Sequence, residues 1–238
     1  MKLKDFKVLT FDCYGTLIDW ESGILAGLAP LTERLNHKLT KNEILEAHAR
    51  CESNQQRQTP TKRYKEILAI VYRRLAEEWG VSTSWDECIN YGNSIKNWPA
   101  FADSVDALKY LKQHYKLVIL SNIDNESFAA SNSKLGVEFD AIYSAEDIGS
   151  FKPSDANFEY MLSMLQRLGF NKSAILHTAE SMFHDHAPAN RHSIKSCWIY
   201  RRHGQEGFGA TAHPDNSPTY DFRFNSMAEL VEAHKQEI

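Results

Sequence analysis

The residue of clearest chemical interest in this chain is Asp12, a carboxylate that directly follows the short apolar run at residues 8–11. Such a β-prone run is typical of a buried strand in a parallel sheet. Gly15 follows three positions later, and because glycine accepts backbone angles closed to other residues, the chain can turn sharply there. Open α/β folds carry their chemistry at the carboxyl edge of the sheet. The sequence therefore predicts a reactive carboxylate at that edge.

Further polar side chains follow other predicted strands. They are Ser121, Asn122, Lys152 and Asp185. Because the carboxyl ends of parallel strands lie on one edge of a sheet, we expect these residues to meet in one pocket. A carboxylate nucleophile in a partly dry pocket must stay ionised, and a nearby ammonium lowers its pKa through opposite charge. Lys152 is the candidate for that role; an exposed loop lysine is the simpler alternative.

Four segments resemble, in order and approximate spacing, the motifs of the haloacid dehalogenase superfamily. They are Phe11-Asp-Cys-Tyr-Gly-Thr-Leu17, Leu120-Ser-Asn122, Lys152-Pro153 and His184-Asp-His186. One such match alone is weak evidence, but four in order span nearly the whole chain. The Asp-x-Tyr form of the first segment is similar to the branch of the L-2-haloacid dehalogenases.

Tyr14 separates two chemistries within that superfamily. Its phosphatases carry a second aspartate at this position, two residues after the nucleophile. A phosphatase needs that carboxyl to protonate the leaving alkoxide, and a phenol with a pKa near ~10 is a poor substitute. A halide leaves without a proton. Tyr14 therefore argues against phosphoryl transfer and is harmless to dehalogenation.

The resemblance implies catalytic roles for the matching residues. Asp12 is expected to be the nucleophile, with Thr16 holding its carboxylate by a hydroxyl. Asp185 is expected to pair with Lys152 and fix its position. A simpler alternative for Thr16 is that it caps the turn after the first strand.

Substrate-binding roles follow from the same resemblance. Ser121, followed by Asn122, is expected to donate a hydrogen bond to the substrate carboxylate or to the nucleophile; a turn serine is the alternative. Tyr14 is expected to line the halide pocket or to fill core. The resemblance also implies an arginine from the first part of a cap, for which Arg50 is the first candidate and Arg57 the alternative.

Two positions depart from the family pattern. Met182 stands where an asparagine is usual, three residues before Asp185, and Phe158 stands where a tyrosine is usual, six residues after Lys152. That asparagine is expected to help handle the substrate carboxylate or the hydrolytic water. Its absence motivates the hypothesis of a weakly active relative that binds a small acid or a protein partner.

The pattern of apolar residues predicts two kinds of structure. Residues 20–98 show helical spacing only, with one helix expected to begin at Thr59-Pro60-Thr61. Residues 99–238 alternate strands and helices, the first of these helices capped by Asp103. The fold class is therefore α/β: a Rossmann-like parallel sheet core (1–19 and 99–238) with helices on both faces and, as the resemblance implies, an all-helical cap (20–98). A basic loop at 201–214 is expected to be solvated.

The composition limits the cellular setting. The 238 residues include 42% hydrophobic residues, which is ordinary for a soluble globular protein. Their net charge of −4 argues against nucleic acid as the main partner. The four widely spaced cysteines indicate reduced thiols, and neither a signal peptide nor an apolar span of about 20 residues is evident. We expect a cytoplasmic protein that does not bind membranes. The resemblance further implies no cofactor and often a homodimer. No metal is expected, because with Tyr14 in place of an aspartate the set of ligands that would bind magnesium is incomplete.

The sequence thus predicts a hydrolase that converts short 2-haloalkanoic acids to 2-hydroxy acids through an ester on Asp12. A magnesium-dependent small-molecule phosphatase is the first alternative, disfavoured by Tyr14. The weakly active small-acid-binding relative is the second.

Overall fold

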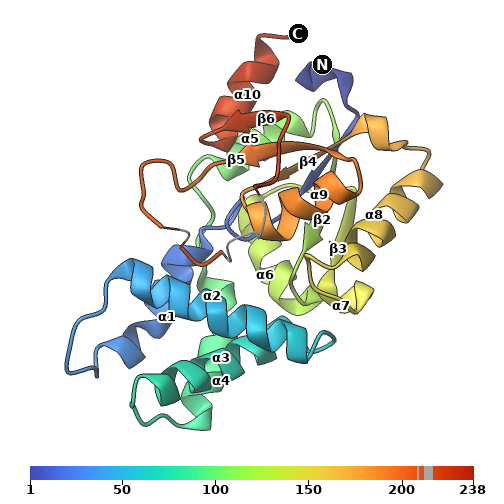
Figure 1. Cartoon of the computed structure of the whole chain (residues 1–238). Helices are drawn as coiled ribbons and strands as arrows, with labels where there is room; N and C mark the ends of the chain where they lie inside the picture. Colours follow the sequence, from blue (N-terminus) through green and yellow to red (C-terminus); the bar gives the residue numbers. More distant parts are fainter. Residues whose placement is uncertain (208, 212–216) are drawn as a thin grey trace.

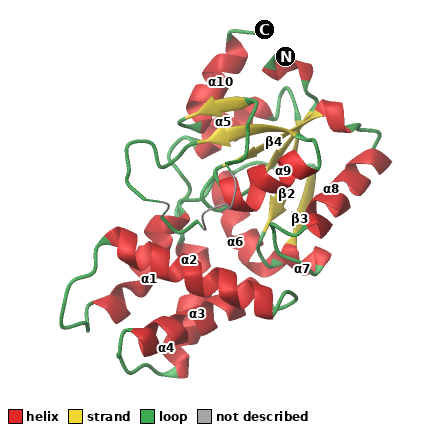
Figure 2. Ribbon diagram, viewed as in Figure 1, coloured by secondary structure: helices red, strands yellow, loops and turns green. Residues whose placement is uncertain are grey.

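The computed structural model describes residues 1–207, 209–211 and 217–238, and these form a six-stranded parallel sheet with helices on both faces and a group of helices at one end (Figures 1 and 2). The strand order is β3-β2-β1-β4-β5-β6. The strands are β1 (Val8–Phe11), β2 (Lys116–Ser121), β3 (Ala141–Ser144), β4 (Ile175–Ala179), β5 (Lys195–Ile199) and β6 (Phe222–Phe224). The predicted fold class is confirmed.

Strand β1 is central, and its register sets the position of the site. Phe11 pairs with Ile119 of β2 on one side and with Thr178 of β4 on the other. All four residues of β1 are buried, as expected of a strand covered on both faces. The next residue, Asp12, therefore emerges at the carboxyl edge between the ends of β2 and β4, where the sequence predicts the chemistry.

Helices cover both faces of the sheet because strand side chains alternate between the faces. Leu9 and Phe11 pack into one apolar cluster with α5, α6 and α10, whereas Val8 packs into a second cluster with α8 and α9. The core helices are α5 (Ser104–Leu111), α6 (Asn125–Leu135), α7 (Ala145–Ile148), α8 (Asp155–Arg167), α9 (Ala187–Arg191) and α10 (Met227–Lys235).

Residues between β1 and β2 form a separate group of helices. They are α1 (Trp20–Thr32), α2 (Lys41–Gln58), α3 (Tyr64–Glu78) and α4 (Trp85–Gly92), followed by a short 3-10 helix (Asn93–Asn97). In Figure 1 these helices, coloured blue to green, lie together at the end of the molecule opposite the two termini. The assignment of residues 20–98 as a separate cap domain stays a prediction.

Two details of the predicted helices are wrong. Pro60 does not begin a helix: α2 continues to Gln58, and α3 begins only at Tyr64. A residue before proline avoids helical angles, and Thr59, with φ −137°, ends α2 instead. Asp103 precedes α5, but its carboxylate makes no capping hydrogen bond and pairs with Arg201 at 2.9 Å.

None of the helices in the described part of the chain is both long and apolar enough to cross a bilayer.

Candidate active site

Lys152 lies at the centre of the residues that meet at the carboxyl edge of the sheet. Its Nζ donates to Asp12 Oδ1 at 2.9 Å, to Asp185 Oδ1 at 2.6 Å and to the Leu120 carbonyl at 2.9 Å. These three bonds use all three ammonium protons. The side chain is 2% exposed, which excludes the alternative of a surface loop lysine. Residues from three strand ends are thus joined through one buried charge.

The backbone of Lys152 is held by Asn122. The amide of Asn122 accepts from the Lys152 N–H at 2.6 Å and donates to the Lys152 carbonyl at 3.0 Å. Both ends of the carboxamide are therefore occupied in positioning the lysine loop. Next to it, the Oγ of Ser121 is buried without a hydrogen-bond partner among the described residues. Of Ser121 and Asn122, the two residues predicted to bind substrate, Ser121 therefore has a hydroxyl that is available to donate to a ligand.

Thr16 orients the carboxylate of Asp12. Its hydroxyl donates to Asp12 Oδ2 at 3.0 Å and accepts from the Glu180 N–H at 3.0 Å. Since the backbone amide occupies the acceptor side of the hydroxyl, the hydroxyl proton points to Asp12. Both oxygens of this carboxylate are thereby fixed, one by Lys152 and one by Thr16.

The turn that carries Thr16 is itself fixed by Arg201. The guanidinium donates twice to the Thr16 carbonyl, at 2.9 and 3.1 Å, and pairs with Asp103. Its neighbour Arg202 is buried and pairs with Glu21 at 2.5 Å. The expectation of a solvated loop is therefore wrong for these two arginines, because each side chain is largely buried and pairs with a partly buried carboxylate. Of the predicted loop 201–214, residues 208 and 212–214 lie outside the described residues.

Burial and charge compete in setting the pKa values of this cluster. Burial raises the pKa of Asp185, but Lys152 and the hydrogen bond from His177 outweigh it, so this pKa lies below its ordinary value. Burial and the charge of Asp185 raise the pKa of Asp12 above its ordinary value, against the lowering effect of Lys152. The predicted lowering effect of Lys152 on the pKa of Asp12 is present, but burial outweighs it, so the net shift of this pKa is upward.

His177, on β4, supports Asp185 from behind and was not predicted. Its Nε2 lies 2.8 Å from Asp185 Oδ1, and its Nδ1 lies 2.8 Å from Thr10 Oγ1. A histidine within a fully buried strand was the available signal. The second oxygen, Asp185 Oδ2, is buried with no partner among the described residues. The cluster therefore keeps an acceptor free for a further donor.

A small cavity of about 30 Å³ lies over Asp12 and Lys152. It is lined by Asp12, Tyr14, Trp20, Glu52, Gln56, Tyr64, Ser121, Asn122, Lys152, Ser181, His184, Asp185 and Thr211. An outer cavity of about 370 Å³ adjoins it, sharing Gln56, Lys152 and His184 as walls. As it stands, the inner cavity has room for about one or two water molecules.

Tyr14 lines the inner cavity, but its hydroxyl is turned toward the core. The phenol oxygen lies 2.8 Å from Ser131 Oγ on α6, and the ring stands edge-on to Trp98. Burial raises the pKa of this phenol well above its ordinary value. Tyr14 therefore presents a neutral ring to the site.

Arg50 is not brought to either cavity, which corrects its assignment as a substrate-binding residue. Its Nη2 donates to both carboxylate oxygens of Glu78 of α3, at 2.7 and 2.8 Å, and its side chain is 54% exposed. The reason is helix phase: two residues along an α-helix turn by about 200°, so Arg50 faces away when Glu52 faces the site. The alternative, Arg57, lies on the wall of the outer cavity.

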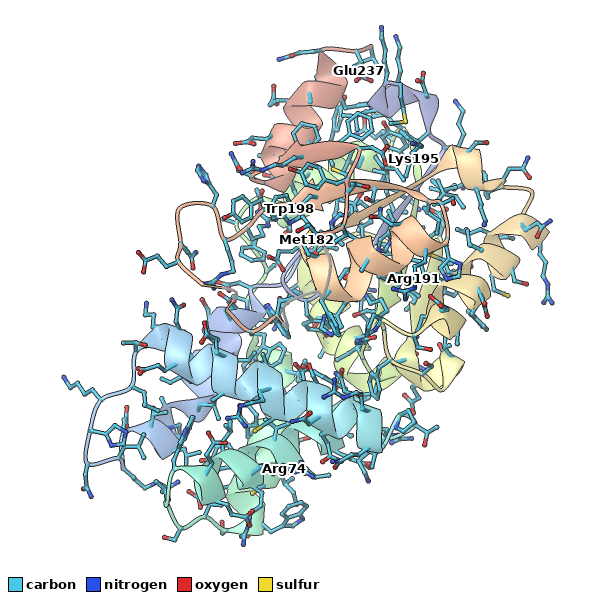
Figure 3. All side chains as sticks on the ribbon, viewed as in Figure 1. Arg74, Met182, Arg191, Lys195, Trp198 and Glu237 are labelled. Carbon is cyan, nitrogen blue, oxygen red and sulfur yellow. The ribbon has the colours of Figure 1, made fainter. Side chains whose placement is uncertain are left out.

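The two departures from the family pattern lie outside the inner cavity. Phe158 is fully buried in α8, packed between His177 and His192. Met182 begins a π-helical turn (Met182–His186) and does not line the cavity in the described structure, although Asp185 of the same turn does. In Figure 3, Met182 is labelled in the part of the molecule that contains the sheet, and Arg74 is labelled in the group of helices formed by residues 20–98.

Several lining residues were not predicted, above all Glu52 and Gln56 of α2 and Tyr64 of α3. A signal was present in the sequence. The buried stripe of α2 continues from Ile44 and Leu45 into His48, Glu52, Gln55 and Gln56. A helix stripe that faces the interior and yet is polar indicates a site on that face.

Comparison with known proteins identifies the family. The family model described as haloacid dehalogenase-like hydrolase matches residues 6–178. The chain belongs to this family. A protein of Pseudomonas putida named (S)-2-haloacid dehalogenase is 27% identical over 233 residues, which is 96% of each chain. Another of that name, from Pseudomonas fluorescens, is 33% identical over 133 residues, covering 55% of this chain and 54% of its own length.

Solved structures share the fold. The L-2-haloacid dehalogenase of Xanthobacter autotrophicus with chloropropionic acid covalently bound has a TM-score of 0.77 to this chain and is 17% identical. The match covers 98% of this chain and all of that one. Magnesium-bound YfnB of Bacillus subtilis, a putative hydrolase of the superfamily, has a TM-score of 0.73 at 19% identity. At these identities the likeness concerns the fold alone.

Proposed function

We propose that this protein catalyses the hydrolytic dehalogenation of short 2-haloalkanoic acids to 2-hydroxy acids through an ester on Asp12. The observation that carries the proposal is the buried Asp12 carboxylate, fixed by Lys152 and Thr16 beneath a small cavity. The names of the two curated relatives support the substrate class.

The proposed reaction has two steps. A carboxylate oxygen of Asp12 attacks the carbon that bears the halogen, and the carbon–halogen bond breaks with its electron pair leaving as halide. Water then attacks the carbonyl carbon of the Asp12 ester, which releases the 2-hydroxy acid, restores the carboxylate and yields one proton. Lys152 stabilises the negative charge that develops on the ester carbonyl oxygen in this second step.

The neutral environment of Tyr14 supports dehalogenation over phosphoryl transfer. Its phenol, held by Ser131 and raised in pKa, cannot supply the proton that an alkoxide leaving group requires. The phosphatase alternative therefore keeps less support than the dehalogenase.

We further propose that residues 20–98 act as a cap, because α2 and α3 supply Glu52, Gln56 and Tyr64 to the wall above the nucleophile. The remaining features of the proposal follow from the family resemblance: a cytoplasmic enzyme that works without cofactor and forms a homodimer.

The decisive experiment compares two products. The protein is incubated with chloroacetate or 2-chloropropionate and, separately, with a generic phosphomonoester plus magnesium. We expect chloride release that EDTA does not reduce, no phosphate release above the blank, and no activity in Asp12→Asn. Phosphate release that depends on magnesium, without chloride release, would overturn the proposed function.

The two cap arginines form a matched pair for a second prediction. Arg57 borders the outer cavity, so Arg57→Ala should lower kcat/KM for a haloacid anion by about tenfold at low salt and by less at high salt. Arg50 is paired with Glu78 on the outer surface, so Arg50→Ala should leave kcat/KM unchanged. The reverse ranking of the two variants would show that Arg50 reaches the substrate.

A further inference from the structure

Glu52 is a buried carboxyl in the active-site cavity that the proposed reaction does not use. It is 3% exposed and lines the same small cavity as Asp12. Its Oε1 accepts from the Tyr64 hydroxyl at 2.6 Å and from Gln56 Nε2 at 3.3 Å. Its Oε2 has no hydrogen-bond partner among the described residues. One oxygen is thus fixed and the other is left for a ligand.

Among the described residues, the charged groups of the inner cavity leave no cationic hydrogen-bond donor available for a substrate carboxylate. Asp12 and Asp185 share Lys152, whose three protons are all taken. Burial lowers the pKa of His184 to about 4, so its ring is neutral near pH 7. No described residue of the inner cavity therefore offers a free cationic proton. A substrate carboxylate must be bound there by neutral donors.

The protonation state of Glu52 fits that need. Burial raises its pKa to about 7, with the Tyr64 hydrogen bond acting weakly in the opposite direction. The other titratable groups packed against it are neutral in this range: burial raises the pKa of Tyr14, Tyr64 and Tyr91 well above 10 and lowers that of His48 to about 3. Below neutral pH, Glu52 is therefore a carboxylic acid with one proton to donate.

We propose that Glu52 is a specificity-determining residue that, as a neutral acid, donates a hydrogen bond from Oε2 to the carboxylate of the bound substrate. This inference deepens the proposed function, since it names the group that recognises the acid end of the haloacid. Tyr64 and Gln56 direct the Glu52 proton by occupying Oε1. Ser121, with its free hydroxyl, is a second neutral donor in the same cavity.

The sign of the pH dependence follows from linkage. An anion binds the protonated form of Glu52 and is repelled by the ionised form. Binding therefore weakens as pH rises through the pKa of Glu52, by about tenfold per pH unit once the ionised form dominates in the free protein. Each anion bound at higher pH must also bring one proton into the cavity.

The test uses propionate, an unreactive carboxylate, and isothermal titration calorimetry from pH 6 to 9 in buffers of different ionisation heat. In the wild type we expect the Kd to rise about tenfold per unit above pH 7, with close to one proton taken up per propionate at pH 8. Glu52→Gln keeps a neutral donor of the same shape, so its Kd should be independent of pH with no proton uptake. Tyr64→Phe removes the hydrogen bond that lowers the pKa of Glu52, so this pKa should be higher and the rise in Kd should begin at higher pH.

Glu180 provides the matched control, because burial and the charges of Glu21 and Asp12 raise its pKa to about 8. Glu180→Gln should retain the wild-type pH dependence. The inference would be overturned if the rise of Kd with pH persists in Glu52→Gln or disappears in Glu180→Gln. It would also be overturned if the wild-type Kd does not change with pH, or if propionate does not bind at pH 6. Because propionate cannot react, a protein that binds it in this manner but releases no halide would refute the proposed function and leave the role of Glu52 standing.

Discussion

Replacement of Lys152 by methionine is expected to lower halide release by about 10³-fold or more. Methionine keeps an unbranched chain of similar length but removes the charge that holds Asp12 and Asp185 together. Without the ammonium, burial and mutual repulsion raise the pKa of both carboxylates, so the nucleophile is protonated at neutral pH. Steady-state kinetics with chloroacetate measures the loss.

The same replacement has a predictable effect on stability. A buried carboxylate left without its partner costs about 3–5 kcal/mol at neutral pH. In the wild type, the lowered pKa of Asp185 contributes stability that is present above the unfolded pKa and is lost as pH falls. In Lys152→Met the folded-state carboxylates titrate above their unfolded values, so stability should instead fall as pH rises.

Thermal unfolding at several pH values checks this reversal, and kinetics near pH 5 can be run on a folded variant. Lys195→Met is the matched control, since Lys195 is a half-exposed lysine (labelled in Figure 3) that pairs with Asp221 at the surface. It should change stability by less than about 1 kcal/mol and leave turnover intact. A folded Lys152→Met with near-normal turnover would remove Lys152 from the catalytic site.

Local patterns in the sequence predicted the elements that hold the site. The run at 8–11 became β1 with the same limits, and strands β2 to β6 all lie within residues 99–238, where strands were predicted to alternate with helices. Parallel topology then brings Asp12, Lys152 and Asp185 together without further information, because each follows a strand end. The catalytic cluster was predictable for this reason.

The wall above the cluster was not predictable in the same way. The rotation of α2 about its axis decides whether Arg50 or Glu52 faces the nucleophile, and that rotation is set by packing against α1 and α3. Asp103 illustrates the same limit: the sequence favours a cap, but Arg201, almost a hundred residues away, takes its carboxylate. Choices between local and distant partners depend on the folded arrangement, so sequence spacing alone does not decide them.

The strongest prediction concerns the fate of oxygen at Asp12. In a single turnover in heavy-oxygen water, with enzyme in excess over 2-chloropropionate, ester hydrolysis should place the label in the carboxylate of Asp12. The first molecule of lactate should then carry unlabelled oxygen from the enzyme. The reason is the proposed path: water attacks the ester carbonyl, so solvent oxygen enters the enzyme and not the substrate carbon. Mass spectrometry of the peptide that holds Asp12, together with the product, measures both atoms.

A general-base mechanism gives the opposite distribution, with label in the first product and none in the peptide, and that result would end the covalent hypothesis. Asp12→Asn, which lacks the nucleophilic carboxylate, serves as the control and should form neither labelled peptide nor product. The departure at Met182 adds a distinct outcome. If the second step is impaired, the Asp12 peptide should instead be heavier by the carboxyalkyl fragment of the substrate. Accumulation of this adduct would identify Asp12 as the nucleophile. It would also show that slow hydrolysis of the Asp12 ester is the cause of weak turnover.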